Sequence, residues 1–143
     1  MTESAFLEKV SDTDVKRIAV NYEHDVSLVT NRTYDLASHI GFKRIERTMI
    51  ATAASELANN IIFYAQRGTM TLKHITLGEI NGIEITSTDL GPGINDIDLA
   101  LQDEYSTGGS LGLGLPGAKR LMHEFHFDEQ REQGTKIIIR RWL

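Results

Sequence analysis

The amphipathic pattern between Lys43 and Ala65 constrains the fold of this chain more than any other feature. At about 100° per residue, a helix over this stretch gathers apolar side chains into one stripe. The stripe is made by Ile45, Met49, Ala53, Leu57 and Ile61. Glu56 and Asn60 fall on the same stripe, where a carboxylate is costly unless a metal ion, a reacting proton or a bound ligand satisfies it. We therefore expect function to involve this pair.

The composition indicates one globular domain and excludes several classes of function. The chain has 143 residues, and we expect a flexible N-terminus over 1–13 and a single domain over 14–143. The net charge of −5 argues against nucleic acid as the main partner. No apolar run approaches the roughly 20 residues that cross a bilayer and no signal peptide is visible, so we expect a cytoplasmic protein without a membrane partner. Without cysteine, a thiolate nucleophile and a zinc–thiolate site are excluded.

The hydrophobic periodicities predict an element order of β-α-α-β-β-α-β-β. The predicted elements are a strand at 15–22, helices at 27–40 and 43–65, strands at 69–77 and 80–89, a short helical piece at 97–101, a helix at 112–125, and strands at 125–129 and 135–142. Gly41 is expected to end the first helix, and Asn81-Gly82 to supply the hairpin turn. A change of parity between Leu72 and Ile75 indicates a bulge near 73–74. This order predicts an α+β two-layer sandwich, with a mixed β-sheet covered on one face by helices.

Asp89 is predicted to end a strand on its core-facing side. Strand alternation places Ser87 and Asp89 on one face, just before the loop that contains Gly91 and Gly93. One interpretation is an Asx-type turn, in which the aspartate caps the loop; this is favoured when the segment is taken alone. The other is a ligand-facing acid that accepts a hydrogen bond from an amino group, with glycines that let the backbone approach the ligand.

The glycine-rich segment over 106–117 runs into a predicted helix. Backbone N–H groups at such a helix start can bind phosphate without a basic side chain, although a flexible linker is the simpler alternative. The run from Gly112 to Gly117 fits the pattern G-x-G-x-x-G, but no strand precedes it and no acid follows about 20 residues later. A P-loop is excluded because Lys-Ser or Lys-Thr does not follow Gly117.

Four motifs occur along the chain in a specific order: Glu56-x-x-x-Asn60, Asp89-x-Gly91-x-Gly93, Gly112-x-Gly114 and Gly134-Thr135. Each is weak alone, but the ordered set resembles the Bergerat-fold ATPases, the GHKL group of gyrase, Hsp90, MutL and the histidine kinases. The resemblance covers the chain from about residue 14 to 143. The short segment between Gly93 and Gly112, with no appended domain, resembles the small serine/threonine kinases of bacterial partner switching. The sequences of 55–60, 89–94 and 115–122 are most similar to the switch kinases of the stressosome.

The resemblance implies a role for each motif in the use of ATP and Mg²⁺. Glu56 would act as general base on a serine or threonine hydroxyl, a role that suits a carboxylate on a partly desolvated face. Asn60 would ligate Mg²⁺, with Asn59 as a neighbour only. The residues that would close over the phosphates lie within 108–114 and include Gly108, Gly109, Gly112, Leu113 and Gly114. Residues 103–111 contain no lysine or arginine. The charge of the transition state would therefore be neutralised by Mg²⁺, by backbone N–H groups, by Lys119 or Arg120, or by a partner.

The same resemblance implies how the adenine base would be held. Asp89 would accept a hydrogen bond from the adenine amino group. Thr135 would support the same base, partly through water. Gly91 and Gly93 would shape the adenine pocket.

The partners implied by the resemblance are STAS-domain proteins and a PP2C-type phosphatase. The kinase would phosphorylate a STAS-domain scaffold of the stressosome, and after release it would bind and activate the phosphatase. One alternative is an anti-sigma factor of the same fold, which sequesters a sigma subunit and phosphorylates its antagonist. Another is a non-enzymatic module of this fold; the presence of both Glu56 and Asn60 argues against it.

Overall fold

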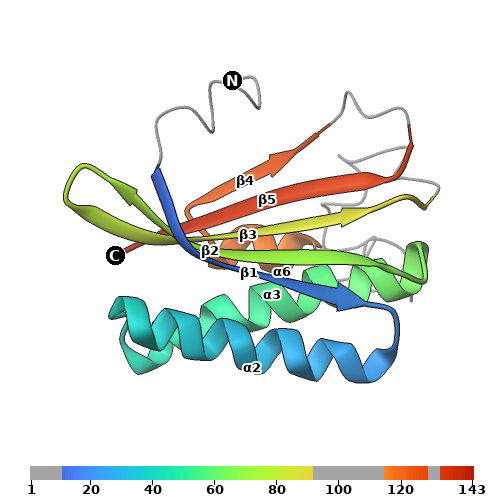
Figure 1. Cartoon of the computed structure of the whole chain (residues 1–143), viewed down its shortest axis with the longest axis horizontal. Coiled ribbons are helices and arrows are strands. Elements are labelled where there is room, and N and C mark those ends of the chain that lie inside the picture. Colours follow the sequence, from blue (N-terminus) through green and yellow to red (C-terminus); the bar gives the residue numbers. More distant parts are fainter. Residues whose placement is uncertain (1–10, 92–114, 129–132) are drawn as a thin grey trace.

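The computed structural model describes residues 11–91, 115–128 and 133–143, which form five strands and three helices (Figure 1). In chain order the elements are β1 (Ser11–Val20), α2 (Glu23–Ile40), α3 (Arg44–Tyr64), β2 (Gly68–Leu77), β3 (Ile80–Asp89), α6 (Leu115–Leu121), β4 (Glu124–Phe127) and β5 (Thr135–Trp142). The predicted order of strands and helices is confirmed. The helical piece expected at 97–101 lies outside the described residues.

The five strands form one sheet in the order β1-β2-β3-β5-β4, and all four pairings are antiparallel, where a mixed sheet was expected. The first pairing has a simple cause. Two successive helices, α2 and α3, carry the chain along the sheet and back again, so β2 begins beside the end of β1, where Val20 pairs with Gly68. A single crossover helix would have produced a parallel pair.

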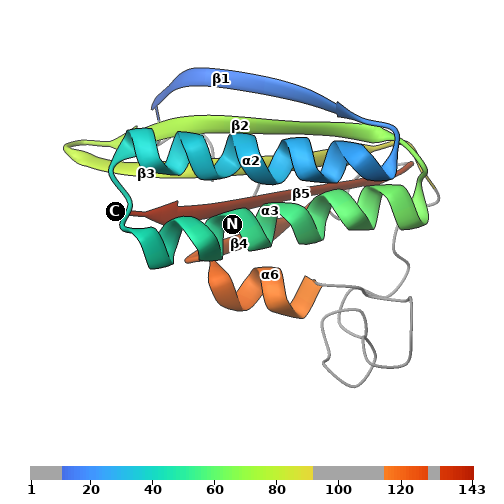
Figure 2. The ribbon, with the colours of Figure 1, turned by 90° about the horizontal axis from the view of Figure 1, so that it is seen from below.

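All three helices lie on one face of the sheet, as the two views in Figures 1 and 2 show. The core lies between these layers and is built mainly of aliphatic side chains. Its fully buried members include Val20, Val29, Leu57, Met70, Leu72, Ile85, Leu115 and Ile139. The two-layer α+β architecture predicted from the sequence is therefore confirmed.

Both ends of α2 have local causes. The carboxylate of Asp25 accepts the backbone N–H groups of Asn21 and Tyr22, each at 2.9 Å. These bonds hold the pKa of Asp25 below its ordinary value, because they favour the charged form. The helix consequently starts earlier than residue 27. At the other end Gly41 has a φ of 118° and its N–H donates to the carbonyl of Ala37, so the predicted stop is confirmed.

The buried face of α3 differs in part from the predicted stripe. Ala53, Leu57 and Ile61 are buried, whereas Ile45 is 75% exposed. Residues four apart advance by about 40° around a helix, so a stripe of five such positions curves by about 160° from one end to the other. The prediction was therefore wrong for Ile45, and Ile50 takes its place in the core.

Two details of the β2–β3 hairpin also differ from the prediction. Leu77 pairs with Ile80, so the turn is made by Gly78, at a φ of 62°, and the residue after it, and not by Asn81-Gly82. The pairing of β2 with β3 is continuous through residues 73–74, so β2 has no bulge there. The irregularity lies in β1 instead, between Thr13 and Lys16.

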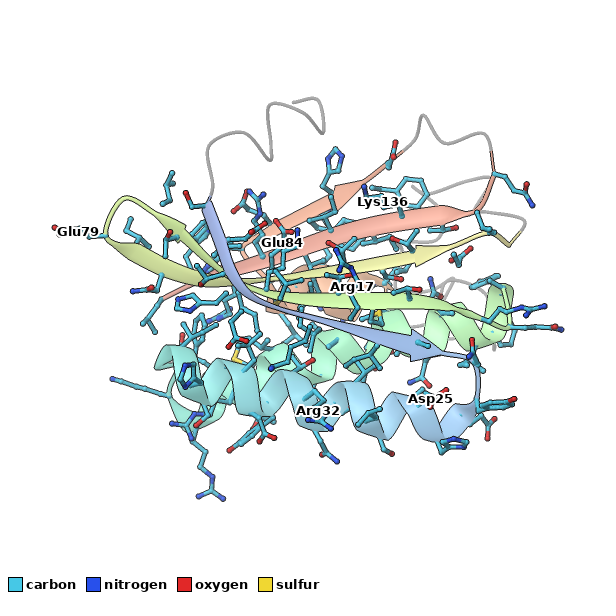
Figure 3. The ribbon with its side chains drawn as sticks, viewed as in Figure 1. Arg17, Asp25, Arg32, Glu79, Glu84 and Lys136 are labelled. Carbon is cyan, nitrogen blue, oxygen red and sulfur yellow. The ribbon has the colours of Figure 1, made fainter. Side chains whose placement is uncertain are left out.

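The face of the sheet turned away from the helices carries charged side chains. Alternation places Arg17, Glu84 and Lys136 on this face, and Figure 3 shows them above the sheet (residues labelled). Glu84 and Arg140 are both buried and form an ion pair of 2.9 Å between Oε2 and Nε. The strands are thus apolar toward the helices and partly ionic on the opposite face.

Candidate functional site

Asn60 occupies the last turns of α3 and is only 6% exposed. Its Oδ1 atom is buried without a hydrogen-bond partner among the described residues. Buried amide oxygens are normally paired, so an unpaired one points to an absent ligand. An amide oxygen is also a ligand that Mg²⁺ accepts, and the position therefore fits such an ion. Asn59, next to it, is exposed, which supports the choice of Asn60.

Glu56 lies one helical turn before Asn60 and is half-buried. Positions four apart on a helix are neighbours on its surface, so the carboxylate and the amide share one side of α3. No hydrogen bond or ion pair engages Glu56 within the described part of the chain. A carboxylate of this kind remains available to accept a proton from a group placed against it.

Asp89 ends β3 on the helix side and is 7% exposed. Its Oδ1 accepts the backbone N–H of Gly91 at 2.9 Å and that of Thr135 at 3.2 Å. The bond to Gly91 is the Asx-type turn that was one of the two interpretations. The bond to Thr135 ties the acid to the start of β5, directly opposite it in the sheet. A carboxylate has about four acceptor sites, so one carboxylate can accept these two bonds together with others.

Three glycines permit the close packing around Asp89. A Cβ at Gly68 would come within 2.5 Å of the Thr88 carbonyl oxygen. A Cβ at Gly91 would lie 2.6 Å from that of Ala65, at the end of α3. At Gly134, where φ is 82°, a Cβ would collide with the carbonyl of Asp89. Sequence analysis missed Gly68, although its pairing opposite Asp89 follows once the hairpin register is known.

The structure thus brings three of the predicted segments together. Gly68, Asp89 and Thr135 lie in one row across β2, β3 and β5. The α3 helix ends against this row, because a Cβ at Gly68 would lie 3.0 Å from Cγ2 of Ile61, the residue after Asn60. The remaining predicted site residues lie outside the described part of the chain: Gly93, Gly108, Gly109, Gly112, Leu113 and Gly114.

The α6 helix begins directly after the predicted phosphate loop and packs against α3. Lys119 and Arg120, the two cations considered for transition-state charge, lie in its last turn and are exposed. The described residues contain no group of three or more histidine, aspartate or glutamate side chains that could hold a metal ion.

A cavity of about 500 Å³ is lined in part by Asp89 and Gly68 of the predicted site. Thr69 and Thr88, which line it, alternate with Gly68 and Asp89 and so face away from the helices. Neither Asn60 nor Thr135 lines this cavity.

Comparison with known proteins agrees with this geometry. The family of histidine kinase-like ATPase domains matches residues 19–141, which include α3, Asp89 and Thr135. The chain belongs to this family. It is also 37% identical to serine/threonine-protein kinase RsbT of Bacillus subtilis (strain 168) over 130 residues, which cover 91% of this chain and 98% of RsbT. The resemblance to the GHKL ATPases, and among them to the small serine/threonine kinases, is thereby confirmed. No helix in the described residues is long and apolar enough to cross a membrane.

Proposed function

We propose that the protein is an ATP-dependent serine/threonine kinase that acts as a partner switch in a stress response. It would phosphorylate STAS-domain proteins of a stressosome and, when released, activate a PP2C-type phosphatase. The observation that carries the proposal is the pairing of half-buried Glu56 with buried Asn60, whose Oδ1 has no partner in the described structure. The similarity to RsbT along almost its whole length supports protein serine or threonine as the acceptor.

In this proposal the residues around Asp89 bind the base. Two backbone N–H groups fix the orientation of the Asp89 carboxylate, so that it can accept a hydrogen bond from the adenine amino group without rearrangement. Thr135 and Gly91 hold the carboxylate and border the same site, with Gly93 as the next residue of the motif. Residues 108–114 would cover the phosphates through their backbone N–H groups.

The chemistry falls to the acid and the amide of α3. Asn60 would hold Mg²⁺ through Oδ1, and the ion when bound would neutralise charge on the phosphate oxygens. Glu56 would accept the proton of the attacking serine or threonine hydroxyl as its oxygen bonds to the γ-phosphorus of ATP. The bond from that phosphorus to the bridging oxygen would break, and ADP would leave. Because phosphoryl transfer depends chiefly on positioning and charge, the rigid helix that carries both side chains is a suitable support.

A transfer assay with labelled ATP, Mg²⁺ and a candidate STAS-domain protein tests the proposal. Glu56→Gln should lower the transfer rate by about 10²- to 10⁴-fold, the usual contribution of a general base, and change ATP affinity by about twofold at most. Glu79→Gln, the same change at an exposed turn, is the matched control and should leave both values unaltered. Equal losses of affinity and rate in the Glu56 variant would contradict the role of base.

The partners require a separate measurement. The unmodified protein should be captured by an immobilised STAS-domain scaffold and released once that scaffold is phosphorylated. Stable capture of a sigma subunit instead would favour the anti-sigma alternative. The proposal also places the protein in the cytoplasm, where ATP and these partners would be available.

A further inference from the structure

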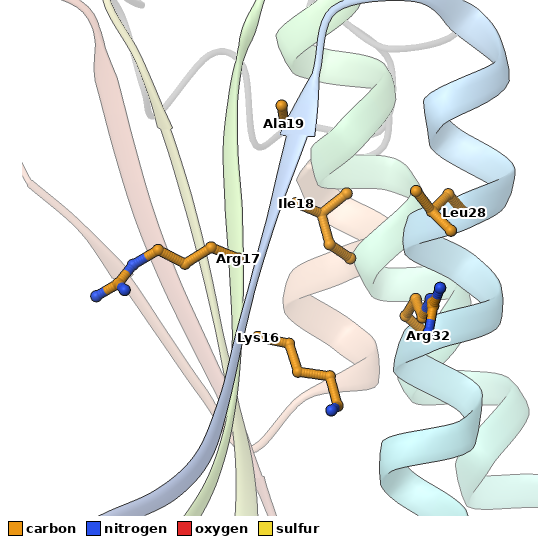
Figure 4. A pocket seen from close by; sticks show the side chains of 6 residues that line it. All are labelled: Lys16, Arg17, Ile18, Ala19, Leu28 and Arg32. Carbon is orange, nitrogen blue, oxygen red and sulfur yellow. The ribbon is translucent and has the colours of Figure 1, made fainter.

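A cationic groove separates the edge strand β1 from α2. It has a volume of about 430 Å³ and is lined by Lys16, Arg17, Ile18, Ala19, Leu28 and Arg32. Figure 4 shows Lys16 extending from the strand on the side of the helix that carries Arg32, while Arg17 extends from the other face of the strand. Cations therefore flank the strand on both sides.

Among the described residues, the outer edge of this strand has no partner. β1 is the outermost strand on its side of the sheet, and within the described part of the chain Lys16–Val20 pairs only with β2. Lys16, Arg17 and Ala19 are exposed. An edge strand of this kind presents unpaired backbone N–H and C=O groups that can template another strand. The irregularity between Thr13 and Lys16 limits the regular edge to its C-terminal half.

The charges of the groove are only partly balanced locally. Lys16 forms an ion pair with Asp14 at 3.4 Å, with both side chains partly exposed, whereas Arg17 and Arg32 form no ion pair within the described residues. The chain as a whole has a net charge of −5, so this cluster opposes the overall charge. Leu28, which is 40% exposed, adds an apolar contact to the helix side. The groove therefore favours a ligand that is acidic, extended and partly apolar.

We propose that an acidic extended segment of a partner protein docks on Lys16–Val20 and adds a sixth strand to the sheet. Its backbone would bond to the free edge of β1, and its alternating side chains would meet Lys16 and Arg32 on one face and Arg17 on the other. This surface goes beyond the proposed kinase site, since two strands of the sheet order lie between β1 and the Thr135 strand.

A second copy of this chain is a poorer occupant of the same edge. Antiparallel pairing of two β1 strands centred on Lys16 would place the two Lys16 side chains opposite one another, and a register centred on Arg17 would do the same for the two Arg17 side chains. Like charges directly opposite are destabilising, whereas the acids of an acidic strand attract the same side chains. In these registers the cationic edge therefore disfavours a copy of itself and favours an acidic partner.

Two-dimensional ¹H–¹⁵N NMR can test this docking with a defined probe. The probe is a capped peptide of threonine, valine, glutamate, aspartate, valine and threonine, and its control carries glutamine and asparagine in place of the two acids. The acidic peptide should shift the amide signals of Lys16–Val20 and slow hydrogen exchange there. Its affinity should fall at least tenfold in the double variant Lys16→Glu with Arg32→Glu.

The matched control is Lys43→Glu with Arg44→Glu, which changes net charge equally at exposed positions away from the groove. It should retain peptide binding within about twofold, because exposed charges more than a Debye length apart are largely screened. ATP affinity should be the same in both double variants, so a failure of docking would leave the proposed kinase function intact. Three results would overturn the proposal: equal binding of the neutral peptide, equal loss of binding in both double variants, or self-association of the unmodified protein that the groove variant abolishes.

Discussion

Replacement of Asn60 by leucine should stabilise the ligand-free protein and at the same time impair its use of Mg²⁺-ATP. Leucine branches at the same atom as asparagine, so its two methyl groups take the places of Oδ1 and Nδ2. The substitution removes a buried acceptor that has no partner in the described structure. Stability should rise while Mg²⁺-ATP binding falls, because an oxygen atom that ligates a cation lacks a partner when the cation is absent.

The expected magnitude follows from burial. An unsatisfied buried acceptor costs about 1–3 kcal/mol, which the substitution recovers. Leucine also has a higher helix propensity than asparagine by a few tenths of a kcal/mol, and Asn59→Leu at the exposed neighbouring position measures that contribution alone. Relative to Asn59→Leu, we therefore expect Asn60→Leu to raise the free energy of unfolding by about 1–3 kcal/mol. For a domain of this length that corresponds to an increase in Tm of roughly 3–9 °C.

Thermal unfolding followed by circular dichroism, without nucleotide, gives the stability of both variants. Isothermal titration calorimetry with Mg²⁺-ATP gives their affinities, which should fall by at least tenfold for Asn60→Leu and stay unchanged for Asn59→Leu. If Asn60→Leu is less stable than Asn59→Leu, the amide oxygen is satisfied in the free protein and the reasoning fails. If its affinity for Mg²⁺-ATP is unaltered, Asn60 does not ligate the ion.

Three further predictions concern the surroundings of the site and the start of α2. Asp89→Asn should weaken ATP binding by about 1–3 kcal/mol in calorimetry, because an amino group then faces the adenine amino group, yet Tm should change little since Oδ1 can still accept both backbone N–H groups. In urea titrations, Gly134→Ala should lower the free energy of unfolding by clearly more than Gly78→Ala does. Both glycines have a positive φ, which costs a residue with a Cβ about 1 kcal/mol. Of these two positions, only Gly134 would also bring the new Cβ within 4 Å of another atom. The lowered pKa of Asp25 means that its stabilising contribution is complete above the ordinary value of about 3.9 and is lost as pH falls through the lower folded value. The difference in Tm between the unmodified protein and Asp25→Asn should accordingly persist from pH 7 to 5 and vanish in strong acid; a constant difference at all pH values would contradict this origin.

The parts of the fold that the sequence predicts correctly are those that depend on local pattern. The long amphipathic run predicts α3 to within a residue at each end, and Gly41 ends α2 where a left-handed residue is required. The hairpin turn was misplaced because Asn-Gly is a strong turn signal, whereas here Gly82 serves another purpose. A Cβ at Gly82 would lie 2.6 Å from the ring of Trp142, so the glycine permits packing across the sheet. A contact between such distant residues cannot be inferred from the hairpin alone.

The candidate site shows the same division between local and distant information. The spacing of Glu56 and Asn60 is enough to place both side chains on one side of a helix. The contact between Asp89 and Thr135 spans 46 residues and depends on the strand order β3-β5. From the sequence, only the resemblance to a family predicted that Asp89 and Thr135 belong to the same site. Glu56 was expected on the apolar stripe but is half-buried, because its exposure depends on how α3 packs against the rest of the fold.

The two interpretations of Asp89 are compatible, because a turn that orients the acid would also prepare it for the proposed ligand. Gly91 and Thr135 both donate to Oδ1, and they come from the segments that leave β3 and enter β5. A carboxylate held by backbone donors loses little further conformational entropy when it accepts a hydrogen bond from a ligand, so ordering of the side chain would not reduce the binding free energy of a base. Gly91→Ala should therefore disturb both the turn and the ligand-binding role of Asp89. The new Cβ would press on Ala65 at the end of α3, and the displaced backbone would deprive the acid of one of the donors that orient it. The capping role and the binding role of Asp89 should accordingly fail together in that variant, whereas Asp89→Asn separates them.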